Sequence, residues 1–224
     1  MKQWRFWYGK GKVLWKKEGR YLAVALLCSV CLWTVCLITS GYAAQIQSGI
    51  SAKVVRFHVL ANSDRTEDQA LKLAVRDRIL AEFGEKLESC TSKEETLQVL
   101  QNSKEEIAVI ATKEVVRQGR QDAVRVSVVR EDFPQKQYGD LVFPAGVYDA
   151  LRVEIGAAQG QNWWCVLYPQ MCYVDAACSK PTAESHIRLE NALTREEFLV
   201  VSALEQETAV PKLKLKIVEW WQNQ

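Results

Sequence analysis

Cys165, His58 and Asp64 are the residues of this chain whose types could build a cysteine hydrolase. A thiol can act as nucleophile, an imidazole as base and a carboxylate as the group that orients it. Cys172 stands seven residues after Cys165, however, and a disulfide between them is the simpler interpretation for an exported protein. His58 falls in an expected strand, where we expect its imidazole to be packed or hydrogen-bonded rather than to act as a base. The sequence therefore predicts no catalytic residue, and a cysteine-dependent wall hydrolase remains an alternative.

Metal ligation is the next chemistry to consider. Asp64, Thr66 and Asp68 alternate as in a calcium loop. Gln69, however, occupies the place where the sharp turn of that loop demands glycine, and Val75 stands where a closing glutamate is needed. A turn followed by a helix cap explains the pattern better. We expect neither a metal nor a cofactor.

The stretch from Gly156 to Trp164 contains two glycines and two adjacent tryptophans. No Gly-Lys-Ser/Thr follows Gly160, so a phosphate loop lacks its lysine, and we expect hairpin glycines. Trp163 and Trp164 lie in an expected strand, where neighbours point to opposite faces. At most one ring can form a surface platform. A cell-wall or glycan-binding module that uses one of them is the main alternative, ahead of the hydrolase.

The beginning of the chain carries a membrane-targeting pattern. No charged residue occurs between Tyr21 and Ala52, and seven Lys or Arg precede that run. This predicts a signal peptide or membrane anchor within residues 1–44, with the N-terminus in the cytoplasm. Gly41-Tyr42-Ala43 is a possible signal-peptidase site. The domain that follows is expected outside the cytosol, either released or anchored.

Charge limits the partners of the exported part. The seven basic residues and Glu18 of the first 44 positions carry +6, and because the whole chain is +2, the remainder is −4. Binding to a phosphate backbone needs a concentrated Lys/Arg surface, so nucleic acid is excluded as a partner. No small-molecule substrate is indicated.

The first half of the exported part predicts a strand and helices. Residues 53–60 alternate β-branched or aromatic residues with polar ones, as a strand does. After an Asn-Ser-Asp turn, Thr66-Glu-Asp-Gln69 has capping-box spacing for a helix with apolar residues every four positions, ending at Gly84. Further cap signatures at Ser92 and Ser103 predict two helices, or one kinked helix, that end at Gly119.

The second half predicts mainly strands. Residues 124–129 alternate as a strand, 141–143 and 148–155 flank a Pro-Ala-Gly hairpin turn, and 162–167 form another strand. A helix that begins with a Thr-x-x-Glu cap at Thr194 is expected over residues 194–204, and residues 212–218 fit either a strand or a helical face. The fold class is therefore α/β (α+β), a single domain with a mixed or antiparallel sheet and two or three helices packed on it.

Six motifs in this order resemble the stage II sporulation protein R family over residues 54–175. They are Phe57-His-Val-Leu-Ala-Asn-Ser-Asp64, Asp68-Gln-Ala-Leu-Lys-Leu-Ala-Val-Arg-Asp77, Tyr138-Gly-Asp140, Phe143-Pro-Ala-Gly146, Tyr148-Asp-Ala-Leu-Arg152 and Gly160-Gln-Asn-Trp-Trp-Cys165. The chain departs from the family pattern at Gln170, where a second proline is expected, and at Ala157-Ala158, where charged residues are more usual.

The resemblance implies an intercellular signal of endospore formation. Such a protein is exported across the forespore membrane into the intermembrane space and activates a membrane-embedded aspartic protease of the mother cell, which then cleaves a sigma-factor precursor. Residues 53–178 would form the signalling domain, and residues 179–224 a C-terminal extension.

The residues expected to contact the partner lie at turns and exposed positions of the matching motifs. Exposed polar groups of a strand-to-helix turn can reach a partner, although turn and cap roles explain them equally well. Arg76 stands beside the apolar stripe of its helix and could pair outward. The expected partner-binding set is Asn62, Asp64, Asp68, Arg76, Tyr138, Asp140 and Trp164.

Overall fold

A computed structural model describes residues 2–172 and 182–207 of the chain, so the tail expected over 212–218 lies outside the described residues. The described helices are α1 (Lys2–Lys53), α2 (Thr66–Glu88), α3 (Lys93–Asn102), α4 (Lys104–Arg117), α5 (Ala183–Ala192) and α6 (Arg195–Glu207). The described strands are β1 (Val55–Leu60), β2 (Val124–Phe133), β3 (Lys136–Tyr138), β4 (Leu141–Phe143), β5 (Gly146–Ile155) and β6 (Asn162–Tyr168).

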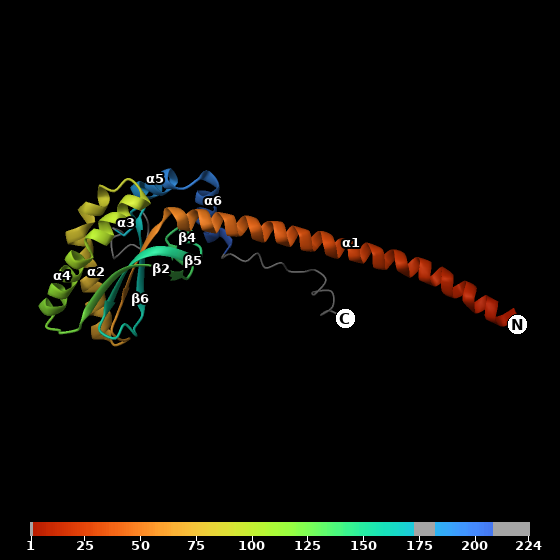
Figure 1. Cartoon of the computed structure of the whole chain (residues 1–224), viewed down its shortest axis with the longest axis horizontal. Helices are drawn as coiled ribbons and strands as arrows, with labels where there is room; N and C mark the ends of the chain where they lie inside the picture. The colour runs from red at the N-terminus through yellow and green to blue at the C-terminus, as the bar shows by residue number, and fades with distance from the viewer. Residues whose placement is uncertain (1, 173–181, 208–224) are drawn as a thin grey trace, which may run out of the picture. The chain divides into compact units, whose positions relative to one another are not determined.

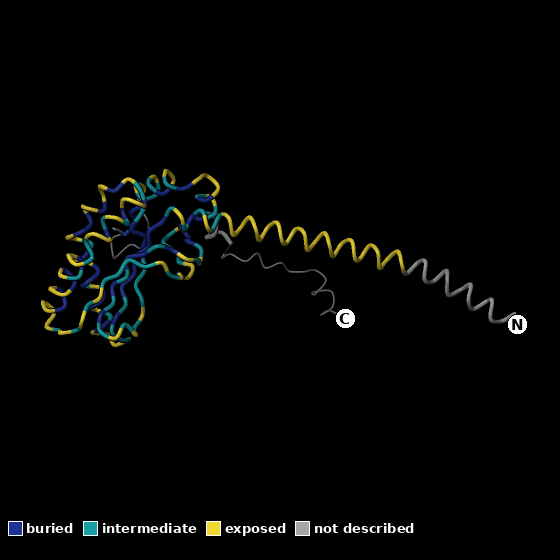
Figure 2. Tube along the Cα trace, viewed as in Figure 1, coloured by how far each residue is buried: buried dark blue, intermediate teal, exposed yellow. Residues whose placement is uncertain are grey.

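The chain divides into two units, residues 1–46 and residues 47–224. The first unit consists of α1 up to Ile46. Its side chains from Tyr21 to Tyr42 are exposed although most of them are apolar (Figure 2). Among the described residues, α1 holds the one stretch long and apolar enough to cross a membrane, Gly19–Lys53. Its length and composition suit a signal sequence or an anchor.

The second unit is built on a four-stranded sheet in the order β2-β5-β1-β6. Strand β1 runs parallel to β5 and antiparallel to β6, and β5 runs antiparallel to β2. Helices α2, α3 and α4 group on one side of the strands (Figure 1). The predicted fold class, a mixed sheet with helices packed on it after an N-terminal apolar helix, is confirmed.

The core lies between the sheet and these helices. Val55, Phe57 and Val59 point to this side from β1, and each is fully buried. The helix α2 packs on these residues with an apolar stripe. Its members are spaced four residues apart and therefore share one helix face. That stripe comprises Leu71, Val75, Ile79, Phe83 and Leu87.

The helix boundaries largely follow the sequence, with two differences. Ser92 caps α3 as predicted, and its side chain accepts a hydrogen bond from the Glu95 N–H. The predicted capping box at Thr66 is wrong, since α2 starts behind Arg65 without a side-chain cap. The predicted end at Gly84 is also wrong, because the buried Leu87 extends the apolar stripe by another turn.

The expected hairpin between residues 141–143 and 148–155 is wrong. Strand β5 pairs with β2 along its whole length, down to Phe133 opposite Gly146. The chain between those two residues therefore leaves the sheet and folds back on itself as a two-stranded ribbon of β3 and β4. Pairing over ten residues of β2 is preferred to pairing with the three residues of β4.

Gly156 and Gly160 are not hairpin glycines, because β1 lies between β5 and β6. Their loop instead crosses the end of β1, where the Gly160 N–H donates to the Ala61 carbonyl at 2.9 Å. A Cβ on Gly160 would lie 2.3 Å from the Ser63 carbonyl oxygen, and Gly156 has φ +60°. Both glycines therefore permit a close backbone approach.

The face of the sheet turned away from α2–α4 is only partly covered. The β3–β4 ribbon and α6 cover one end, and the helix α6 contacts β4. Thr194 and Glu197 form a capping box at the start of α6, as predicted. Glu197 also binds Lys53 at 2.6 Å, which ties α6 to the end of α1 within this unit. The described helices leave the other end of this face uncovered. We call the whole side of the sheet turned away from α2–α4 the helix-free face.

Candidate functional site

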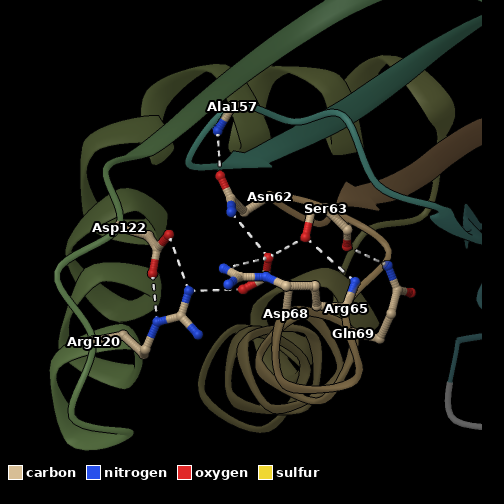
Figure 3. A network of polar contacts seen from close by, with 8 residues as sticks. All are labelled: Asn62, Ser63, Arg65, Asp68, Gln69, Arg120, Asp122 and Ala157. Atoms are coloured by element: carbon tan, nitrogen blue, oxygen red, sulfur yellow. Dashed lines mark hydrogen bonds and ion pairs between the residues drawn. The ribbon is translucent and has the colours of Figure 1, made fainter.

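The turn after β1 is held by a buried carboxylate. Asp68, at the first turn of α2, accepts hydrogen bonds from the Asn62 amide at 2.9 Å and from the Ser63 hydroxyl (Figure 3). Arg120, which follows α4, binds the other carboxylate oxygen at 2.7 Å. The hydrogen bonds from Ser63 and then Asn62, with help from Arg120 and Arg65, hold the pKa of Asp68 well below its usual range.

The same turn fixes the β5–β6 loop. The Asn62 side-chain oxygen accepts from the Ala157 N–H at 2.9 Å (Figure 3), and the Asp64 carboxylate accepts from the Gln161 N–H at 2.7 Å. These contacts give Asn62, Asp64 and Asp68 a structural role each. The Asp64 side chain is nevertheless on the surface, where a partner can also reach it.

The helix-free face has a polar centre. In register across the sheet, Ser127 of β2 lies opposite Arg152 of β5, Arg152 beside His58 of β1, and His58 opposite Trp164 of β6. Because side chains alternate along a strand, these four point away from the apolar core. Strand β1 therefore presents Phe57 to the helices and His58 to the other side.

Arg56 lies in an aromatic cage at the covered end of this face. Its side chain is fully buried, and its guanidinium carbon lies 5.0–5.7 Å from the ring centroids of Phe133, Tyr138, Phe143 and Tyr148. These distances allow cation–π attraction to every ring. Arg56 donates to the Tyr138 hydroxyl at 3.1 Å, and no carboxylate among the described residues pairs with it. Burial lowers its pKa.

His58 is neutral at physiological pH. Burial, followed by the positive charges of Arg152 and Arg56, lowers its pKa to about 4. Its ring stacks on Trp164 with centroids 5.0 Å apart, and its Nε2 contacts the Glu131 carboxylate. Burial raises the pKa of Glu131. The neutral imidazole is therefore packed on Trp164, with the charged side chains of Glu131, Arg152 and Arg56 close to it.

Several buried polar atoms on this face lack a partner. Within the described part of the chain, they are Nε and Nη1 of Arg56, Nδ1 of His58, Nε of Arg152 and Oδ1 of Asn162. The remaining two buried side-chain atoms without a hydrogen bond, Nε2 of His58 and Oε1 of Glu131, contact each other. All of these atoms lie on the face away from α2–α4. Buried polar groups are normally satisfied, so this cluster sets the face apart from the apolar core on the other side of the sheet.

The cysteine, histidine and aspartate considered for hydrolysis are not brought together. Cys165 pairs with Phe57 in register and belongs to the helix-covered core, whereas His58 faces the opposite side of the sheet. Cys165 is joined to Cys172 as a disulfide, with Cα atoms 5.6 Å apart. Asp64 accepts from the backbone of Gln161. A nucleophile and its base cannot act together across a sheet.

Trp163 and Trp164 point to opposite faces, as predicted. Trp163 meets Phe57 edge-on, and the Arg76 guanidinium lies 4.8 Å from its ring centroid. Trp164 stacks on His58. Both rings are half-buried, so each already has a packing partner on one side. The glycan-binding alternative has no freely exposed aromatic platform at these positions.

The other expected partner-binding residues are dispersed. Arg76 lies on the helix-covered side and binds Asp77 at 2.7 Å. Tyr138 belongs to the ribbon over Arg56, and Asp140, at the ribbon turn, lies 3.1 Å from His186 of α5. Of the expected set, Tyr138 and Trp164 therefore lie on the helix-free face, next to Arg56 and His58 respectively.

Sequence reasoning missed Arg56, Glu131 and Arg152. The alternation of residues 53–60 did place Arg56 and His58 on one face, and this signal pointed to a polar side of the strand. The pairing of β1 with β5 was not visible in the sequence, because parallel strands are joined by long crossovers. Without that pairing, Arg152 could not be placed beside His58.

Comparisons with known proteins agree with the resemblance. Residues 51–178 match the family described as Stage II sporulation protein R. Stage II sporulation protein R of Bacillus subtilis (strain 168) is 31% identical over 181 residues, which cover 76% of this chain and 81% of that relative. No solved structure matches the chain. On these two matches, the chain belongs to the stage II sporulation protein R family.

Proposed function

We propose that this protein is an exported intercellular signal of endospore formation that activates a membrane-embedded aspartic protease of the mother cell. That protease would then process the precursor of a mother-cell sigma factor. The observation that carries the proposal is the family match over the folded domain, placed directly after a helix apolar enough to enter a membrane. A relative named stage II sporulation protein R supports the sporulation role.

The geometry is compatible with a protein ligand. The one candidate catalytic trio is split between two faces of the sheet. The helix-free face instead offers half-buried charges and an aromatic ring next to buried polar atoms that lack partners. Aromatic and arginine side chains at the centre of a surface are typical of protein interfaces.

Activation is proposed to occur by a shift of population. The signal would bind the active arrangement of the protease more tightly than the inactive one. A preference of about 1.4 kcal/mol changes the ratio of the two arrangements tenfold. The signalling domain itself then needs no chemistry of its own.

The proposal assigns residues 1–44 to targeting and residues 53–178 to signalling, with residues 179–224 as a C-terminal extension. The basic residues before Tyr21 favour an N-terminus in the cytoplasm, which supports the proposal that the domain lies in the intermembrane space. Within the domain, Tyr138 and Trp164 are proposed to contact the partner from the helix-free face. Asp64 and Asp140 are exposed and would contribute from the neighbouring turns.

The test is reconstitution in a non-sporulating host. The full chain is co-expressed with the candidate protease and its sigma-factor precursor, and precursor cleavage is followed on immunoblots. A variant without residues 1–44 is the control for export. We expect cleavage only when the full chain and the protease are both present.

Two results would refute the proposal. Cleavage that persists without this chain would show that the protease needs no such signal. Absence of cleavage with an exported, folded chain would show that this chain is not the signal, provided that co-expressing the Bacillus subtilis relative in its place gives cleavage.

A further inference from the structure

We infer that the partner of this domain docks on the open end of the helix-free face and contributes acidic side chains there. This inference rests on the proposed function and names the surface and the chemistry of its partner. The docking surface consists of Arg125 and Ser127 of β2, Arg152 of β5, Lys136 of β3 and Trp164 of β6.

Arg125 projects from this surface, and its carboxylate partner is recessed. The Arg125 side chain is 74% exposed, while its partner Glu154 is 13% exposed. Arg152 is 32% exposed and binds Glu154 at 2.7 Å and Glu131, which is 26% exposed, at 3.4 Å. A molecule that approaches β2 therefore meets the positive charge of Arg125 before the negative charge of Glu154.

Arg125 retains donors for an incoming carboxylate. It reaches Glu154 through one weak contact at 3.3 Å, and a guanidinium has five N–H groups in all. The Nε–H of Arg152 is buried, and its Nη1 and Nη2 already bind Glu131 and Glu154, so Arg125 is the arginine that a partner can reach. A carboxylate bound by two N–H groups of arginine forms the strongest and most directional pairing of this kind.

Trp164 supplies the apolar part of the surface. One side of its ring is occupied by His58, and Phe133 meets it edge-on at 4.9 Å. Lys136 Nζ lies 5.7 Å from the same ring centroid and adds a third cation. A rigid aromatic ring surrounded by cations is suited to an acidic protein segment that also carries apolar residues.

Charge reversal at Arg125 is the sharpest test, because its side chain is 74% exposed and makes one contact of 3.3 Å with Glu154. The full chain carrying Arg125→Glu is compared with wild type in the co-expression assay at limiting expression. Arg78→Glu is the matched control, since Arg78 is a half-exposed arginine on α2 that pairs with Glu82. We expect Arg125→Glu to lower precursor cleavage about tenfold and Arg78→Glu to leave it within twofold of wild type.

A neutral variant separates charge from shape. Arg125→Gln keeps the length of the side chain and should retain more cleavage than Arg125→Glu. Equal losses in the two variants would refute an acidic partner, and equal losses in Arg125→Glu and Arg78→Glu would refute this surface. Full cleavage with Arg125→Glu would refute it as well, while the proposed function would stand because wild type is active in the same assay.

Cross-linking covers the case in which the charge variant does not accumulate. A photoreactive amino acid at Ser127, in the middle of the docking surface, is compared with one at Lys113, exposed on α4. We expect an adduct with the protease from Ser127 only. An adduct from Lys113 without one from Ser127 would place the partner on the helix-covered side and overturn the inference.

Discussion

The two faces of the four-stranded sheet come from the same strands but are built in opposite ways. On one face, Phe57 and its neighbours meet α2–α4 in a core of apolar side chains. On the other, Arg56, His58 and Arg152 stand next to aromatic rings and lack part of their hydrogen bonds. The first arrangement stabilises the fold by burying apolar surface, whereas the second buries charged groups and is expected to contribute little to stability. Five predictions test this comparison.

Phe57→Ala should have the largest effect. The residue is fully buried in the helix-covered core, and its removal leaves a cavity there. The free energy of unfolding should fall by about 3–5 kcal/mol. Thermal melting of the detergent-solubilised chain, followed by near-ultraviolet circular dichroism, measures the change. Val109→Ala on the exposed side of α4 is the control, and an equal loss there would contradict the assignment of the core.

Asp68→Ala should have the next largest effect and lower the free energy of unfolding by about 2–4 kcal/mol. The change leaves Asn62 and Ser63 without their acceptor and Arg120 without one of its two carboxylates. The same melting experiment applies. Asp77→Ala is the matched control, because Asp77 is 63% exposed and pairs only with its neighbour Arg76. If both variants melt alike, the turn network does not support the fold.

The polar face should make stability depend on pH. An unfolded chain protonates His58 near pH 6.5, whereas the folded chain does so at a pKa of about 4. The unfolded state therefore binds more protons between these values, and stability is complete above pH 6.5 and declines as the pH falls toward 4. We expect a loss of about 1–2 kcal/mol, since the contact with Glu131 favours protonation.

His58→Phe tests this dependence. Melting temperatures from pH 7 to pH 4.5 should fall less in the variant than in wild type. The pKa of Glu131 is raised in the folded chain, so the titration of Glu131 increases stability as the pH falls, opposite to the effect of His58. The quantity to compare is therefore the difference in melting temperature between wild type and variant at each pH. Parallel pH profiles would show that His58 does not contribute.

Arg56→Met should change the free energy of unfolding by less than about 1 kcal/mol despite the complete burial of Arg56. Replacing a buried charge with an apolar side chain of similar volume is often neutral or stabilising. Arg56→Ala is the control and should destabilise by about 2–4 kcal/mol, because the aromatic cage loses its contents. A Met variant as unstable as the Ala variant would show that the charge itself stabilises this face.

Arg125→Ala should have the smallest effect on folding. The side chain is 74% exposed and its ion pair with Glu154 is at the surface. Such pairs contribute about 0.5 kcal/mol or less. Melting should therefore be unchanged, in contrast to the loss of signalling expected for the charge reversal. A large drop in melting temperature would show that Arg125 stabilises the fold, and would contradict its assignment to partner binding alone.

The elements with strong local signals were predictable. The strand at residues 55–60, the helix cap at Ser92 and the capping box at Thr194 follow from alternation and cap spacing, which depend on neighbouring residues. The β4–β5 hairpin and the hairpin glycines were mispredicted. Strand β5 pairs with the ten residues of β2 instead of the three residues of β4, and β1 from the start of the domain inserts between β5 and β6.

The candidate site was predictable only in part. Asn62, Asp64 and Asp68 were identified from the sequence, but the structure shows each of them bound to neighbouring turns or loops. Trp164 was identified together with Trp163, and only the direction of the strand separates the two. The polar row from Ser127 to Trp164 needs four strands in register, and no local pattern encodes it.

The sequence by itself determined the apolar N-terminal helix, the α+β class, the family and the two-sided character of residues 55–60. Each of these depends on composition, on spacing within one element or on a string of motifs. Only the tertiary structure decided that β1 lies between β5 and β6, and that Arg56, His58 and Arg152 share a face away from Cys165. The physical reason is that strand pairing is settled by competition among distant segments for the same backbone groups and the same buried area.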